Sequence, residues 1–82
     1  EGIIVTPAKT LFAAKEKIKF EIEIPHALNI YKALEGNAPK SHDEFMEVII
    51  KANRIELPEL PAGHKYAYDP KTETLMVEKP AQ

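Results

Sequence analysis

The chain has 82 residues, of which 44% are hydrophobic and 29% charged, with a net charge of −2 at pH 7 and no cysteine. This length suits a single small domain, and the lack of cysteine excludes disulfides, thiolate metal sites, iron–sulfur clusters and covalent c-type haem. Acidic and basic residues are interleaved without a basic run of the kind that binds nucleic acid, and no apolar stretch is long enough to enter a membrane as a span.

The first seven residues form an initial segment, residues 1–7, with an apolar patch at Ile3, Ile4 and Val5. Such a patch either packs back on the core of its own chain or frays, or it serves as a docking strand for another chain. The sequence starts at Glu1, as it would at a processing site or at the edge of an expressed fragment. On the first of these interpretations we expect an exported, periplasm-like location after signal removal.

The segment from Ala8 to Glu35 carries the longest pattern in the chain. Its apolar residues recur at alternating spacings of four and three, which places them on one helical face: Phe20, Ile24, Ala27, Tyr31 and Leu34. Gly36 follows as a natural C-terminal stop. Pro25 lies inside the segment, where a proline removes a hydrogen bond and costs ~3 kcal/mol in a straight helix.

A second pattern overlaps the first over residues 17–24. Apolar and charged residues alternate there with the period of a strand, the apolar ones being Ile18, Phe20, Ile22 and Ile24. Two structures are therefore open: a long helix kinked at Pro25, or a strand over residues 17–24 with Pro25 opening a shorter helix. We favour the kinked helix, because Leu11 to Lys17 is rich in Ala, Lys and Glu and the helical spacing continues in phase after it.

Ser41 and Glu44 predict the start of a second helix after the loop 36–40. The Ser41 side chain can cap the free N–H groups of the first turn, and Glu44 can reach back to the N–H of Ser41 itself. The helix should run to about Ala52, with Asn53 as its stop. The residues on its apolar face are Phe45, Val48, Ile49 and Ala52.

The remainder of the chain predicts an extended strap and a hairpin. Prolines at 58 and 61 keep Ile55 to Pro61 extended. Two short apolar strands flank the loop 69–73, and residues 79–82 form a tail. The fold class is thus α+β, with a long helix, a second short helix and a C-terminal two-stranded antiparallel hairpin. The expected core comprises Phe20, Ile24, Tyr31, Phe45, Ile49, Tyr66, Tyr68 and Val77, and Leu75 should join the apolar face of the hairpin.

Residues that would indicate catalysis are scarce. Ser41 is the only serine and is explained as a helix cap, and no cysteine nucleophile exists. The histidines, His26, His42 and His64, form no metal-binding motif. Glycines are isolated, so no phosphate loop is present. We therefore expect a protein that is not an enzyme and has no catalytic, metal or cofactor site.

Surplus apolar residues instead indicate contacts with other protein chains. Several residues of the first helix lie off its expected core face, so they either pack under the hairpin or form an interface. The Leu-Pro-Glu-Leu-Pro strap is either packed on the core or offered as a pre-ordered binding segment. The candidate interface residues are Leu11, Phe12, Ile18, Ile22, Leu57, Pro58, Leu60 and Pro61.

The order of features from Ala27 onward resembles the soluble domain of type II secretion and type IV pilin-like proteins. The residues that carry this resemblance are Ala27, Leu28, Tyr31, Gly36, Pro39, Ser41, Glu44, Phe45, Leu60, Pro61, Gly63, Tyr66, Tyr68, Asp69 and Pro70. These 82 residues contain neither the hydrophobic membrane helix of such proteins nor its processing motif, and we expect their larger sheet to be reduced here to one hairpin. The order Ser-His-x-Glu-Phe-Met and Leu-Pro-x-Leu-Pro is also similar to small planctomycete-type proteins that organise nitrite oxidoreductase into tubules. The resemblance implies an assembly subunit.

Two functional hypotheses follow from the sequence. The first is a non-catalytic structural subunit that self-associates or binds the subunits of a larger complex, for example a redox complex. The second is a small ligand- or metal-binding accessory module that uses His26, His42 and His64. Neither hypothesis involves nucleic acid or membrane insertion.

Overall fold

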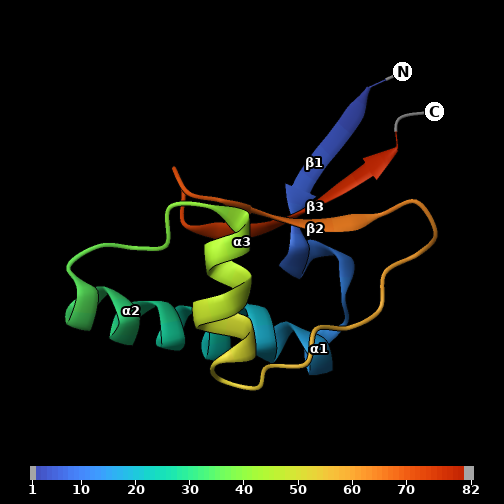
Figure 1. The fold of residues 1–82 in the computed structure, drawn as a ribbon. Helices are drawn as coiled ribbons and strands as arrows, with labels where there is room; N and C mark the ends of the chain where they lie inside the picture. Colours follow the sequence, from blue (N-terminus) through green and yellow to red (C-terminus); the bar gives the residue numbers. More distant parts are fainter. Residues whose placement is uncertain (1, 81–82) are drawn as a thin grey trace.

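The computed structural model describes residues 2–80 and has an α+β fold. A three-stranded antiparallel sheet lies over a long helix, and a second helix runs between them (Figure 1). The apolar residues that the two helices and the sheet share form one core. The α+β class inferred from the sequence is therefore confirmed.

The sheet has one strand more than the predicted hairpin. Strands β2 (Lys65–Asp69) and β3 (Thr74–Pro80) form the hairpin, and β1 (Ile3–Pro7) pairs with the other edge of β3. The order is β1-β3-β2, with Ile3 opposite Pro80. A lone hairpin is marginally stable, and the Ile-Ile-Val run is β-branched and suits a strand.

This third strand corrects the predictions for both ends of the chain. Residues 3–7 of the initial segment form an edge strand that pairs with β3 of their own chain, so they are not a frayed end. Residues 79 and 80 of the predicted tail belong to β3. The remaining residues of these two segments, 1 and 81–82, lie outside the described part of the chain.

The long helix is continuous from Ala14 to Glu35. It comprises α1 (Ala14–Ile18), a π-helical turn (Lys19–Glu23) and α2 (Ile24–Glu35), and a 3-10 turn (Ala8–Leu11) precedes it. Residues 17–24 are all helical, so the alternative strand over 17–24 is wrong. Gly36 ends the helix with φ 88°, and its N–H donates to the carbonyl of Lys32 at 2.8 Å.

The π-helical turn lies where the proline would otherwise clash. In an α-helix the ring of Pro25 would crowd the carbonyl of Glu21. The N–H of Ile24 instead bonds to the carbonyl of Lys19, five residues back, so the turn before the proline is wider than an α-helical turn. Since Pro25 has no N–H, the carbonyl of Phe20 has no donor four or five residues ahead.

The second helix begins as α3 (His42–Phe45) and continues as a π-helical turn (Met46–Lys51). The Ser41 hydroxyl accepts the N–H of Glu44 at 3.1 Å, as expected for the cap. The Glu44 carboxylate, however, accepts the N–H of Lys40 at 3.1 Å rather than that of Ser41. At the other end, the side chain of Asn53 donates to the carbonyl of Ile49 at 2.8 Å.

The core lies between the sheet and the two helices. Its buried members are Ala8, Phe20, Ile24, Ala27, Leu28, Phe45, Ile49, Ile50, Tyr68, Leu75 and Val77. Of the expected core residues, Tyr31 and Tyr66 are only half-buried, and the others are buried. Two residues assigned to apolar helical faces are exposed instead, Leu34 at the end of α2 and Ala52 after the second helix.

Candidate protein-binding surface

The long helix carries a row of exposed aliphatic side chains along its outer side and at its C-terminal end. Its members are Ile18, Ile22, Ile30 and Leu34, which are 49%, 61%, 48% and 78% exposed. We call this set the aliphatic row. The exposed His26 occupies the middle of the same four-residue spacing. Figure 1 shows the long helix at the outside of the molecule, with the sheet and α3 on its other side.

The geometry of the helix explains why the row has no partner within the chain. Phe20, Ile24 and Leu28 point into the core, so positions two residues away lie across the helix from them. Side chains four residues apart are neighbours on successive turns, so Ile18 lies next to Ile22 and Ile30 next to Leu34, with His26 between the two pairs. Exposed aliphatic side chains gathered in this way are characteristic of interaction surfaces.

Some candidate interface residues of the first helix are exposed, and others pack against the core. Ile18 and Ile22 are exposed and belong to the aliphatic row, and Leu11 is 36% exposed. Phe12 is half-buried and stacks on Phe20, with ring centroids 5.2 Å apart and planes at 12°. Phe12 therefore packs against the core of its own chain.

The sequence analysis did not predict the other two members of the row, Ile30 and Leu34. Leu34 was assigned to the core face because it continues the four-and-three spacing of Phe20, Ile24 and Tyr31. The helix, however, extends beyond the sheet at its C-terminal end (Figure 1), so no element covers Leu34. The spacing could have indicated that Ile30 belongs to the row, because Ile30 lies four residues before Leu34 and eight residues after Ile22.

The proline-rich strap is largely held by its own chain. Leu57 and Leu60 are partly buried against the core. The hydroxyl of Tyr66 donates to the carbonyl of Pro58 at 2.6 Å and fixes the middle of the strap. Pro58 is half-buried and Pro61 is exposed. The strap thus offers little free apolar surface, in contrast to the aliphatic row.

A second exposed apolar area lies on the edge strand β1. Ile3, Ile4 and Val5 are each about half exposed or more. They precede Thr6, whose buried hydroxyl has no hydrogen-bond partner among the described residues. An exposed strand edge with apolar side chains can pair with another chain, so this strand provides a natural comparison for experiments on the aliphatic row.

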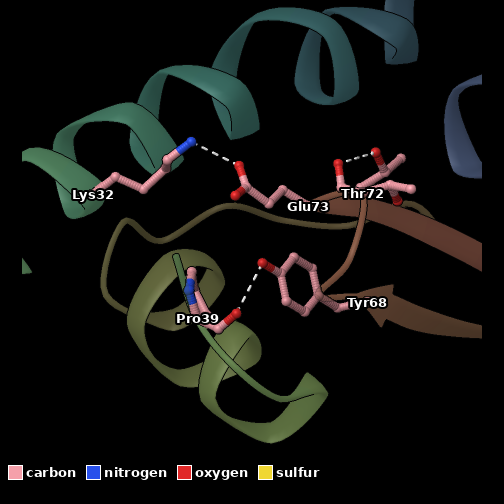
Figure 2. Close-up of polar contacts among 6 residues, drawn as sticks. Lys32, Pro39, Tyr68, Thr72 and Glu73 are labelled. Carbon is pink, nitrogen blue, oxygen red and sulfur yellow. Dashed lines mark hydrogen bonds and ion pairs between the residues drawn. The ribbon is translucent and has the colours of Figure 1, made fainter. Parts of the chain in front are cut away.

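A groove of about 460 Å³ lies between the long helix and the hairpin loop. Its lining combines apolar side chains such as Phe20 and Ile24 with the acidic residues Glu21 and Glu73. Glu73 is already engaged, because its carboxylate pairs with the ammonium of Lys32 at 2.7 Å, as Figure 2 shows. The residues that line the groove are Pro7, Lys9, Phe20, Glu21, Ile24, Pro25, Leu28, Asn29, Thr72, Glu73, Thr74 and Leu75.

The histidines do not come together. His26 is on the exposed side of α2, and His64 contacts the carbonyl of Ala62 at 3.1 Å in the turn before β2. The Nδ1 atom of His42 accepts the N–H of Tyr68 at 3.0 Å and so covers the free edge of β2. Within residues 2–80, no group of three or more His, Cys, Asp or Glu side chains could hold a metal ion.

Polar contacts fix the two helices relative to each other beneath the row. The hydroxyl of Tyr31 on α2 donates to the carboxylate of Glu44 on α3 at 2.8 Å. The N–H of Lys40 and this hydroxyl lower the pKa of Glu44, and the same hydrogen bond raises the pKa of Tyr31. The long helix is therefore held in place independently of any partner on its outer side.

Two further tyrosines secure the sheet to the helices. Burial raises the pKa of both Tyr66 and Tyr68 to about 12. Tyr68 donates its hydroxyl to the carbonyl of Pro39 at 3.0 Å (Figure 2). Both hydroxyls have a structural role, since each donates a hydrogen bond to a backbone carbonyl of the same chain.

No family model, curated protein or solved structure matches the chain. The likeness to pilin-like proteins noted from the residues thus remains an expectation. Among the helices of residues 2–80, none has the length and apolar character that crossing a bilayer requires.

Proposed function

We propose that this protein is a non-catalytic assembly module that binds protein chains through the aliphatic row of its long helix. The observation that carries the proposal is the exposure of Ile18, Ile22 and Ile30 across the long helix from its packed residues, with the exposed Leu34 one turn beyond Ile30. The row costs the isolated chain free energy that a partner would recover.

The free energy that a partner would gain by burying the row can be estimated from typical values for aliphatic side chains. Fully burying one large aliphatic side chain contributes about 1.5–3 kcal/mol. The members of the row are roughly half to three-quarters exposed, so each retains a large part of this gain for a partner. Association opposes it with several kcal/mol of lost translational and rotational freedom, which makes a moderate affinity the natural outcome.

The proposal is tested by placing a charge in the row. In light scattering across a concentration range, the wild type should form a species larger than one chain, or should co-purify with a defined partner. Ile22→Lys should abolish this association, because burying an unpaired ammonium is unfavourable. A strictly monomeric wild type that co-purifies with nothing would overturn the proposal.

The matched control is Ile3→Lys on the edge of the sheet. Ile3 and Ile22 are both 61% exposed, so the two variants introduce the same charge at equal exposure. Association should survive Ile3→Lys. Association that is lost in Ile3→Lys but kept in Ile22→Lys would assign the interface to β1 and remove the row from it.

A further inference from the structure

We propose that the outer edge of β1 pairs with β1 of a second copy of this chain, antiparallel and about a two-fold axis at Ile4. The two three-stranded sheets then form one continuous sheet. This edge is a different surface from the aliphatic row, so the inference goes beyond the proposed function and does not rest on it.

The outer edge of β1 has no partner strand in the described part of the chain. The sheet order is β1-β3-β2, so β3 pairs with one side of β1 only. The opposite edge of the sheet is protected, because His42 accepts the N–H of Tyr68 in β2. Natural proteins protect open edges with charged residues or prolines, and the segment from Ile3 to Val5 contains neither.

The bond to His42 also shows which backbone groups of the sheet face outward. Opposite residues of antiparallel strands alternate between pairs that exchange hydrogen bonds and pairs whose backbone groups turn away from each other. Because the N–H of Tyr68 bonds to His42, Tyr68 and its partner Leu75 turn away from each other. The backbone of Leu75 is therefore directed towards β1, as is that of Val77, whose partner there is Thr6. Thr6 thus faces β3, and its neighbours along β1 face outward.

By this alternation the residues of β1 with outward backbone groups are Ile3, Val5 and Pro7. Pro7 has no N–H to offer, as is usual for a proline on the free side of an edge strand. Its carbonyl already accepts the hydroxyl of Thr10 at 2.8 Å. The open edge therefore consists of the N–H and carbonyl groups of Ile3 and Val5.

One register satisfies all four of these groups in both copies. With Ile4 opposite Ile4 of the second copy, Ile3 lies opposite Val5 and exchanges two hydrogen bonds with it, and the two-fold axis repeats this pair. An axis at Val5 would place Ile3 opposite Pro7, which has no N–H and an occupied carbonyl. An axis at Ile3 would carry Val5 past Gly2, beyond the partner strand.

The side chains at this edge are ones that their own chain leaves uncovered. Ile3, Ile4 and Val5 are each about half exposed or more. β2 pairs with β3 only as far as Glu78, and Figure 1 shows the remaining two-stranded end of the sheet projecting beyond the helices. In the proposed pair, Ile4 contacts its own copy on one face and Ile3 contacts Val5 on the other. The added strands support a ribbon that alone is marginally stable.

The charges of the described residues around the edge do not oppose this pairing. Lys79 lies opposite Ile4 on β3, and its two copies are three strand spacings apart, or roughly 14 Å. This separation exceeds the Debye length of about 8 Å at physiological salt. Glu78 pairs with Lys65 at 3.8 Å, and the residue in line with it across the axis is uncharged. Lys9 follows β1 and lies past the paired segment.

A second copy fits the edge better than a flexible peptide because its strand is already formed. Ordering a flexible peptide costs about 1–2 kcal/mol per residue, whereas β3 holds β1 in both copies. The contact is short and buries far less than the ~800 Å² per partner of a standard interface. We therefore expect a dissociation constant on the order of 1 mM. Such a contact escapes light scattering at micromolar concentration and forms where copies are held close together.

Cysteine cross-linking detects such a weak pair, because the chain has no cysteine of its own. Under mild oxidation, Ile4→Cys should form a covalent dimer about tenfold faster than Ala52→Cys, a control at an exposed position after the second helix. Opposite residues at the axis have α-carbons about 4.5 Å apart, which a disulfide spans. Val5→Cys should cross-link with itself as slowly as the control, because its β-carbons are about 7–8 Å apart. Equal rates for Ile4→Cys and Val5→Cys would overturn the pairing about Ile4.

An edge proline tests the hydrogen bonds of the pair. Adding Val5→Pro to Ile4→Cys removes an outward N–H and spares the bonds to β3, which run through Ile4 and Thr6. The rate of cross-linking should fall to that of Ala52→Cys while the circular dichroism spectrum stays that of the folded chain. An unchanged rate would overturn the hydrogen-bonded edge. If the proline variant unfolds, the comparison of Ile4→Cys with Val5→Cys still decides.

The outcomes distinguish this inference from the proposed function. Slow cross-linking of Ile4→Cys, together with an association that Ile22→Lys abolishes, would overturn the pairing of β1 and leave the proposed function intact. Fast cross-linking of Ile4→Cys in a chain that binds nothing through the aliphatic row would support the pairing of β1 and overturn the proposed function.

Discussion

The ring of Tyr68 in β2 stacks on the ring of Phe45 in α3, with centroids 4.3 Å apart and planes at 9°. The hydroxyl of Tyr68 also donates to the carbonyl of Pro39 at 3.0 Å. One side chain thus joins the sheet, the second helix and the loop that precedes this helix.

Two substitutions separate the stacking from the hydrogen bond. Phe45→Ala empties a fully buried site and should lower the free energy of unfolding by about 3–5 kcal/mol. Tyr68→Phe keeps the ring and leaves the Pro39 carbonyl without its donor, so it should cost about 1–2 kcal/mol. Urea denaturation measures both values, and a Phe45→Ala midpoint close to that of the wild type would contradict the packing of the core.

The carboxylate of Glu44 gives the fold a dependence on acidic pH. Its pKa is lower in the folded chain than the ordinary value of 4.5, so near that pH the unfolded chain binds more protons. The stabilisation by Glu44 is therefore present above about pH 4.5 and is lost as the pH falls through the lowered pKa. The melting temperatures of the wild type and Glu44→Gln should differ at neutral pH and converge in strong acid.

Serine-to-alanine replacement is the control for this pH effect. Ser41→Ala removes the hydroxyl that accepts the N–H of Glu44 in the same helix cap, and this hydroxyl does not titrate. Its cost, ~1 kcal/mol for a typical cap, should be the same at neutral pH and in acid. A difference between the wild type and Glu44→Gln that is equally insensitive to pH would assign the role of Glu44 to packing rather than charge.

Pro25 should be a destabilising residue in its present position. Pro25→Ala returns an N–H to the helix where the π-helical turn lacks one, and alanine has the higher helix propensity. We expect a gain of about 1 kcal/mol, since the loss of the proline's restriction on the unfolded chain offsets part of the benefit. Denaturant midpoints provide the measurement, and a less stable variant would show that the proline is required for the packing of Ile24.

Two glycines with similar backbone angles should respond differently to alanine. Gly36 has φ 88° with open space around it, whereas a β-carbon at Gly63, where φ is 82°, would lie 3.2 Å from the Pro80 ring. Gly36→Ala should cost about 1 kcal/mol for its left-handed backbone. Gly63→Ala should cost more, because Pro80 must also move. Equal melting temperatures for the two variants would show that the end of β3 adapts freely.

Local signals predicted the helices well because their causes lie close together in the sequence. The Ser41 cap, the Gly36 stop and the spacing of Phe20, Ile24 and Ala27 each depend on residues within a few positions. The preference for a helix over residues 17–24 was correct because its spacing agreed with that on both sides, whereas the strand alternation stopped at Pro25.

Features that depend on distant parts of the chain were not predicted. β1 forms only because β3 lies beside it, and no residue near Ile3 indicates this partner. Leu34 fits the core face by spacing, yet the sheet does not extend far enough to cover it. Half of the aliphatic row was missed for this reason, because periodicity identifies a face of a helix but not the length over which a neighbour covers it.

The pairing of Ile3 with Pro80 places the ends of the described chain side by side (Figure 1). During synthesis, β1 emerges first, but β3, the central strand of the sheet, emerges last. The ribosome must therefore release almost the whole domain before either edge strand finds its partner, while the helices between them can form earlier. Until then, the apolar side chains of β1 remain exposed, and this interval is when the nascent chain most needs protection from aggregation.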